Sequence, residues 1–207
     1  MLNKIRDYLD FAGLQYRNPD KAGAEREKML AFRHKGQEAR KAFTELAKAF
    51  QVSHPEWQLQ QTSQWMNQAQ RLRPHFWVYL QREGKVTEPM LALRLYGNPS
   101  DFGISLEISF IERKKDEQTL GKQVKVLEIP TVEGIYYLVY SDDQSQRWDA
   151  NEENRQILRN KLSNQEVRKV LVKADVSVTE NSSEEDIVEN LLKSYDKIFP
   201  FYLATRN

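Results

Sequence analysis

The chain reads HFWVYLQREGKVTEPMLALRLYGNPSDFGISLEISFI between residues 75 and 111. Within this stretch, residues 75–81, 90–96 and 104–111 each alternate apolar with polar or aromatic side chains. A period of two is typical of a strand with one buried face. The two joins between these segments are short and contain glycine and other turn-forming residues. Because parallel strands need a crossover of about a dozen residues, the short joins predict an antiparallel meander.

Hydrophobic periodicity predicts further elements on both sides of this meander. The strand over 135–140 is apolar on both faces, so we expect it to be central in the sheet, and we expect 141–154 to be a polar, acidic loop around Trp148. The last helix is expected to open with a capping box of Ser182 and Glu185 and to end at Pro200. The remaining expected elements are helices over 2–14, 21–50, 116–127 and 152–162 and a strand over 167–176.

Together these elements predict an α+β fold. We expect an antiparallel sheet of four to five strands, with a mixed sheet as the alternative, a helical N-terminal part, and helices packed on one face. A length of 207 residues suits one domain. We therefore expect a single domain over 1–207, in which 1–55 is helical, 56–74 is an irregular connection that could include one short helix or edge strand, and 75–207 forms the sheet with its flanking helices. Trp57 and Trp65 of the connection are expected to pack onto the core.

Several classes of protein are excluded by what the sequence lacks. It has no cysteine, which excludes disulfides, thiolate nucleophiles and cysteine-ligated zinc. Its eight glycines form neither a dinucleotide-binding loop nor a P-loop nor a nucleophile elbow. A formal net charge of +1 excludes a strongly basic or strongly acidic protein. No secretory signal and no long apolar run is visible, so we expect a cytoplasmic protein with no membrane partner, no metal site and no cofactor.

The polar face of the predicted sheet is the candidate site. If the first hairpin is centred on its turn, Trp77 lies opposite Arg94, and Arg94 lies beside Ser105 or Glu107. An arginine between a tryptophan ring and a carboxylate forms a cation–π contact and an ion pair, which suits a base, a sugar or an aromatic ligand. The alternative is a partly covered face stabilised by cross-strand pairs alone. The candidate ligand-binding residues are His75, Trp77, Tyr79, Arg94, Tyr96 and Glu107, and no catalytic residue is assigned.

Other charged clusters give weaker hypotheses. The predicted helix over 21–50, with Arg71 and Arg73 nearby in the sequence, could contact phosphates, or its charges could form i,i+4 pairs such as Lys41 with Glu45 on a solvated face. Asp101 and Glu112 superficially match a metal-dependent nuclease, but a strand of about 36 Å would separate them. The acidic residues after 141 could hold a cation or simply be solvated. The charged residues of the helix are Lys21, Arg26, Lys28, Arg33, Lys35, Arg40, Lys41 and Lys48 against Glu25, Glu27, Glu38 and Glu45.

The runs HFWVYL (75–80), LALRLYG (91–97) and IYYLVY (135–140) resemble a family of bacterial cytoplasmic proteins of about this size that carries the label of a glucose-6-phosphate dehydrogenase family. The resemblance implies an enzyme that acts on a phosphorylated or sugar substrate, and it carries no catalytic motif onto this chain. Two of the runs are also similar, more loosely, to the DNA-reading N-terminal domains of modification-dependent restriction systems.

Three functions are therefore open. The leading hypothesis is a soluble, non-catalytic binding or interaction module that uses the sheet face with Trp77, Arg94 and Glu107, its partner a small molecule or a protein. The second is the enzyme that the family label implies. The third, which we do not favour, is nucleic-acid binding through the basic N-terminal helix. Whether the chain is an enzyme is left undecided.

Overall fold

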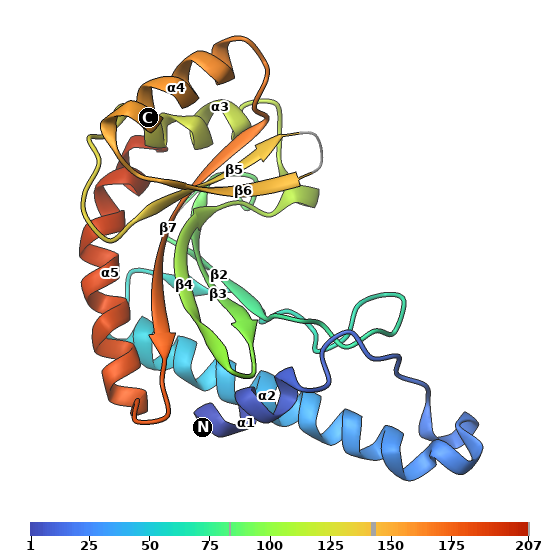
Figure 1. Cartoon of the computed structure of the whole chain (residues 1–207). Helices are drawn as coiled ribbons and strands as arrows, with labels where there is room; N and C mark the ends of the chain where they lie inside the picture. The colour runs from blue at the N-terminus through green and yellow to red at the C-terminus, as the bar shows by residue number, and fades with distance from the viewer. Residues whose placement is uncertain (83, 142–143, 207) are drawn as a thin grey trace.

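The computed structural model describes residues 1–82, 84–141 and 144–206, and it has an α+β fold (Figure 1). One antiparallel sheet of seven strands has the order β1-β2-β3-β4-β7-β5-β6. The strands are β1 (Gln58–Leu59), β2 (Trp77–Gln81), β3 (Met90–Asn98), β4 (Asp101–Ser109), β5 (Tyr136–Ser141), β6 (Gln144–Asp149) and β7 (Lys169–Val178). The α-helices in the described part of the chain are α1 (Leu2–Leu9), α2 (Arg26–Val52), α3 (Thr119–Val124), α4 (Glu152–Ser163) and α5 (Glu184–Ala204).

The antiparallel sheet and the helical N-terminal part agree with the sequence prediction, but the predicted number of strands is wrong. The sheet has seven strands rather than four to five because the prediction did not count the two edge strands: β1 was only an alternative within the connection, and β6 was not expected. β1 is only two residues long. β6 lies in the segment expected to be a loop, and it pairs with β5 from Tyr136↔Asp149 to Ser141↔Gln144. An edge strand needs no apolar alternation when its side chains stay in water, and β6 is mostly exposed.

Two further details differ from the prediction. β5 is not central, because it lies between β7 and the edge strand β6, while β4 occupies the middle of the sheet. Helix α5 is capped one residue later than expected, by a reciprocal pair of hydrogen bonds between Ser183 and Asp186. It also continues through Pro200 to Ala204. Pro200 is exposed, and the carbonyl group that loses its helical donor belongs to the exposed Asp196, so water replaces the missing bond.

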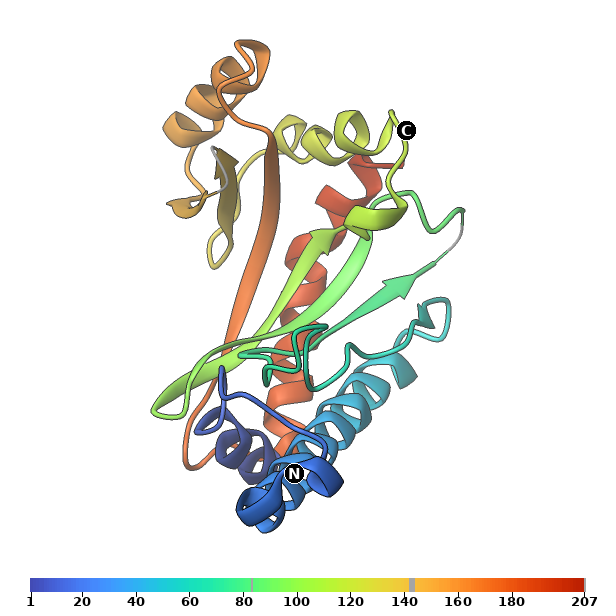
Figure 2. The same cartoon turned by 90° about the vertical axis from the view of Figure 1, so that its right-hand side faces the viewer.

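Helices α1, α2 and α5 lie against one face of the sheet and form the core with it (Figures 1 and 2). The ring of Phe76, just before β2, joins the two parts, since it stacks on Tyr8 of α1 at 5.0 Å and lies 6.0 Å from Phe43 of α2. Trp57 and Trp65 are buried in the same core, as expected. The strands bend between the part with β5, β6, α3 and α4 and the part with α1 and α2, so the other face lies on the inside of the bend (Figure 1).

Among the described residues, no helix combines the length and the apolar character that crossing a lipid bilayer requires.

Candidate functional site

The face of the sheet that points away from the core helices is called the open face here. Figure 2 looks onto it: α5 runs behind the strands, and no helix lies in front of β3, β4 and β7. Successive side chains of a strand point to opposite faces of the sheet. Residues next to a core position such as Leu93 therefore lie on the open face. The polar, charged and aromatic side chains of the open face include Arg73, His75, Trp77, Tyr79, Arg94, Tyr96, Asp101, Ser105, Glu107, Tyr136, Tyr140, Arg147, Asp149, Lys169, Lys173 and Asp175.

The predicted residues meet in one row across the strands. Trp77 lies directly opposite Arg94, as the hairpin register predicted, and the guanidinium carbon of Arg94 is 5.4 Å from the centre of the indole ring. The Nε and Nη2 atoms of Arg94 lie 3.0 and 2.9 Å from Oε1 of Glu107. The row continues beyond the predicted residues, because Nζ of Lys173 is 2.9 Å from Oε2 of Glu107. The carboxylate of Glu107 in β4 therefore pairs with two cations, one from β3 and one from β7, the strands on either side of it.

Glu107 is completely buried, so this row is structural rather than an exposed cross-strand pair. Burial raises the pKa of a carboxyl group, but the charges and hydrogen bonds of Arg94 and Lys173 outweigh that effect and lower the pKa of Glu107 to about 2. Burial likewise lowers the pKa of Arg94, and Glu107 more than reverses this. Glu107 is therefore ionised at neutral pH and cannot serve as a proton donor there.

A second cluster lies where β7, β5 and β6 meet. The hydroxyl group of Tyr136 donates to Asp175 at 3.0 Å, and Nη1 of Arg147 donates to the same carboxylate at 2.8 Å. The Arg147 guanidinium carbon is 3.6 Å from the centre of the Tyr136 ring. Burial, followed by the charge of Asp175, raises the pKa of Tyr136. The contacts with Asp175 and with the Tyr136 ring hold the guanidinium group of Arg147 in one position on the open face.

A third cluster surrounds Lys169 at the start of β7. Its ammonium group pairs with Glu112, and it lies 4.0 Å from the ring of Tyr140 and 5.0 Å from that of Phe110. Burial lowers the pKa of Lys169, and the hydrogen bond to Glu112 opposes this effect. The strands β4 and β7 separate near this point, and the buried amide of Gln123 bridges the carbonyl groups of Ile108 and Val170.

Arg73 was expected beside the basic helix and not on the sheet face. Its guanidinium carbon is 4.7 Å from the centre of the Trp77 ring, its Nε atom is buried without a hydrogen-bond partner, and no carboxylate pairs with it in the described part of the chain. The signal was present, since Arg73 extends the period-two series of His75, Trp77 and Tyr79 by one step. Proline is usual at the start of a strand, so the predicted strand began after Pro74 and did not include Arg73.

His75 lies beside the same indole ring, with 5.7 Å between the ring centres. Burial, followed by the charges of Arg94 and Arg73, lowers the pKa of His75 from 6.5 to about 4. The imidazole is therefore neutral at pH 7.

The two remaining candidate residues are tyrosines. The hydroxyl group of Tyr79 donates to the carbonyl group of Phe110 at 3.2 Å, and the ring of Tyr96 packs over Gly103.

We expect the low pKa of His75 to make stability depend on pH between about 6.5 and 4. In that range the unfolded chain binds a proton at His75 and the folded chain does not, so the free energy of unfolding falls as the pH falls. The contribution reaches at most about 1.4 kcal/mol per pH unit. Urea denaturation at several pH values should show a flatter profile for His75→Gln than for the wild type. Parallel profiles for the two proteins would contradict the assignment.

The weaker sequence hypotheses gain little from the structure. On α2 and the turn before it, Lys28 pairs with Glu25, and Glu45 pairs with Lys48 rather than with Lys41. Asp101 and Glu112 flank an uninterrupted β4, and no group of three metal-ligating side chains exists in residues 1–82, 84–141 and 144–206. Two of the acidic residues proposed for a cation, Asp142 and Asp143, lie outside the described residues.

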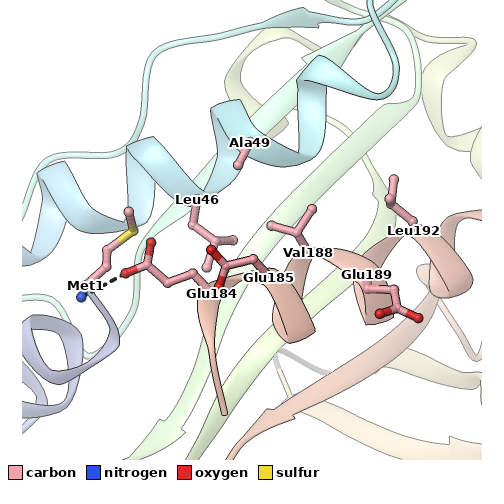
Figure 3. A pocket seen from close by; sticks show the side chains of 8 residues that line it. All are labelled: Met1, Leu46, Ala49, Glu184, Glu185, Val188, Glu189 and Leu192. Atoms are coloured by element: carbon pink, nitrogen blue, oxygen red, sulfur yellow. Dashed lines mark ion pairs between the residues drawn. The ribbon is translucent and has the colours of Figure 1, made fainter.

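A cavity of about 380 Å³ lies away from the open face, between α2 and α5 (Figure 3). Leu46 and Ala49 of α2 and Val188 and Leu192 of α5 line it, and Glu184, which pairs with the amino group of Met1, lies at its rim. None of the predicted site residues lines this cavity.

Comparison with known proteins gives no family model, no curated protein and no solved structure that matches this chain. The family resemblance inferred from the strand runs is therefore not tested by these comparisons.

Proposed function

We propose that this protein is a non-catalytic binding module, that the open face is its binding surface, and that its ligand is negatively charged. The observation that carries the proposal is the row of fixed cations on a face that no helix covers. Alternation along β4 and β6 also places Asp101 and Asp149 on this face, so its five cations are matched in number by five carboxylates when the partner of Lys169 is included. These residues are Arg73, Arg94, Arg147, Lys169 and Lys173 against Asp101, Glu107, Glu112, Asp149 and Asp175.

Three of these carboxylates are already occupied by the cations. Glu107 holds Arg94 and Lys173, Asp175 holds Arg147, and Glu112 holds Lys169. These pairs orient the cations instead of moving protons, so the arrangement supports binding rather than general acid–base catalysis. The enzyme implied by the family resemblance stays the alternative, and it would have to use His75, whose imidazole is neutral at pH 7.

The face is also preorganised. Aromatic rings hold cations in place at three points, with Arg94 over Trp77, Arg147 over Tyr136 and Lys169 over Tyr140. Side chains that are fixed before the ligand arrives lose little conformational entropy on binding. A ligand that crosses the strands would therefore meet Arg73, Arg94 and Arg147 at fixed positions, because the side chains of Lys169 and Lys173 are only 7% and 5% exposed.

We expect a single-stranded DNA 10-mer, used as a polyanionic probe near ~50 mM salt, to bind at this face and to weaken steeply as salt is added. Amide chemical shifts of the whole chain should change along β2, β3, β7 and β5. The variant Arg147→Gln should bind more weakly than the wild type, and the charge-matched variant Lys21→Gln on the N-terminal side of α2 should bind like the wild type.

Two results would overturn this proposal. Shifts confined to α2, with Lys21→Gln the weaker binder, would favour nucleic-acid binding through the basic helix instead. An absence of any complex under these conditions would remove an anionic ligand from the open face.

A further inference from the structure

The Trp77 end of the open face holds positive charge that the protein itself does not neutralise. Two guanidinium groups, those of Arg73 and Arg94, lie within 4.7 and 5.4 Å of the centre of one indole ring. Arg94 is neutralised by Glu107, which also holds Lys173. Arg73 has no such partner among the described residues, and its Nε atom is buried without an acceptor. A partly buried guanidinium group without an acceptor leaves an unsatisfied donor, which is costly unless a ligand supplies the acceptor.

A second arginine without an ion pair in the described part of the chain interacts electrostatically with Arg73. The Tyr79 hydroxyl group donates to the carbonyl group of Phe110, which ties β2 to the segment after β4. Arg113 follows three residues later in a short 3₁₀ turn, Glu112–Lys114, and is exposed. The charge of Arg113 is felt at Arg73, where it adds to burial in lowering the pKa of that guanidinium group. The described chain supplies no ion pair to Arg113 either.

We propose that Arg73 and Arg113 form a subsite for a phosphoryl group at the Trp77 end of the open face, with His75 as a further hydrogen-bonding group. This inference rests on the proposed function and specifies its ligand chemistry. The planar fork of arginine binds the oxygen atoms of carboxylates and phosphates in pairs. Two unpaired guanidinium groups match the charge of a phosphate dianion better than that of a single carboxylate.

His75 supplies a readout for this subsite. The groups that act on its protonation are Arg94, Arg73 and Lys173, which oppose the charged form, and Glu107, which favours it. A bound dianion would offset the arginine charges and favour the imidazolium form. Binding and protonation of His75 must therefore strengthen each other.

The experiment uses sulfate as the probe, because sulfate has the shape and charge of a phosphate dianion and does not titrate between about pH 5 and 8, and acetate as the comparison. The ring signals of His75 are followed by NMR at constant ionic strength and assigned with His75→Gln. We expect sulfate to move the Trp77 indole signal and to raise the pKa of His75, and acetate to bind at least tenfold more weakly. Arg73→Gln should weaken sulfate binding by at least tenfold and Arg113→Gln by several-fold, whereas the neighbouring controls Arg71→Gln and Lys114→Gln should leave it unchanged.

Arg73→Gln also reports on its own folding. Without sulfate, the loss of the Arg73 charge should raise the pKa of His75 relative to the wild type, which shows that the variant keeps the native arrangement. Equal sulfate responses in the wild type and Arg73→Gln, equal responses to sulfate and acetate, or no change at Trp77 and His75 would each overturn the phosphoryl subsite. If the DNA probe binds the open face while sulfate fails at Trp77, the subsite is wrong and the proposed function stands. If sulfate binds there while the DNA probe shifts only α2, the subsite stands and the row of cations across the strands is not a surface for a polyanion.

Discussion

A Glu107→Ala variant should lose about 3–5 kcal/mol of unfolding free energy, the usual effect of removing one partner from a buried ion pair. The carboxylate of Glu107 is fully buried and holds Arg94 at 2.9 Å and Lys173 at 2.9 Å. Without it, two cations remain close together in a site that water barely reaches, since only 5% of the Lys173 side chain is exposed. Urea denaturation at pH 7, followed by circular dichroism, measures the loss.

A triple variant separates the effect of unpaired charge from that of lost packing. Replacing the whole cluster by apolar residues of similar size, as Arg94→Met, Glu107→Leu and Lys173→Met, should give a stability close to that of the wild type, because buried ion pairs seldom stabilise more than good apolar packing. A loss of less than about 1 kcal/mol in Glu107→Ala, a value typical of exposed pairs, would show that the row is solvated and not structural.

The sequence predicted the first half of the open face well because the information there is local. The alternation of residues 75–81 and 90–96, with a short turn between them, determines which side chains face each other, and Trp77 does lie opposite Arg94. The burial of Glu107 could not be predicted in this way. It depends on Lys173, which comes from a strand that follows two helices later in the chain.

The missed elements have a related explanation. β6 is polar along its length and becomes a strand only because β5 offers it an unpaired edge. The connection over 56–74 has no clear period, since its path is determined by distant contacts. The indole of Trp65 lies where a side chain on Gly36 of α2 would be, with 2.6 Å between the ring and an ideal Cβ atom. The phenol oxygen of Tyr8 lies 2.6 Å from the carbonyl oxygen of Trp65 and 2.8 Å from that of Arg73.

These contacts lead to the second large expected effect, at Phe76. The ring of Phe76 is fully buried between Tyr8 of α1, Phe43 of α2 and the core side of the sheet. Phe76→Ala should lower the unfolding free energy by about 3–5 kcal/mol through lost burial and the cavity left behind. The same substitution at Phe199, which is only partly buried, is the matched control and should have a clearly smaller effect.

The shape of the transition in Phe76→Ala tests more than the size of the cavity. If the N-terminal helices and the sheet share one core, as the stacking of Tyr8 on Phe76 indicates, the variant should still unfold as a unit. Circular dichroism and tryptophan fluorescence should then give coincident urea transitions, both at lower urea than in the wild type. Loss of helical signal before the fluorescence change would show instead that residues 1–55 unfold on their own. In that case the prediction of a single domain over 1–207 would be wrong, and the open face would belong to a sheet that is stable without them.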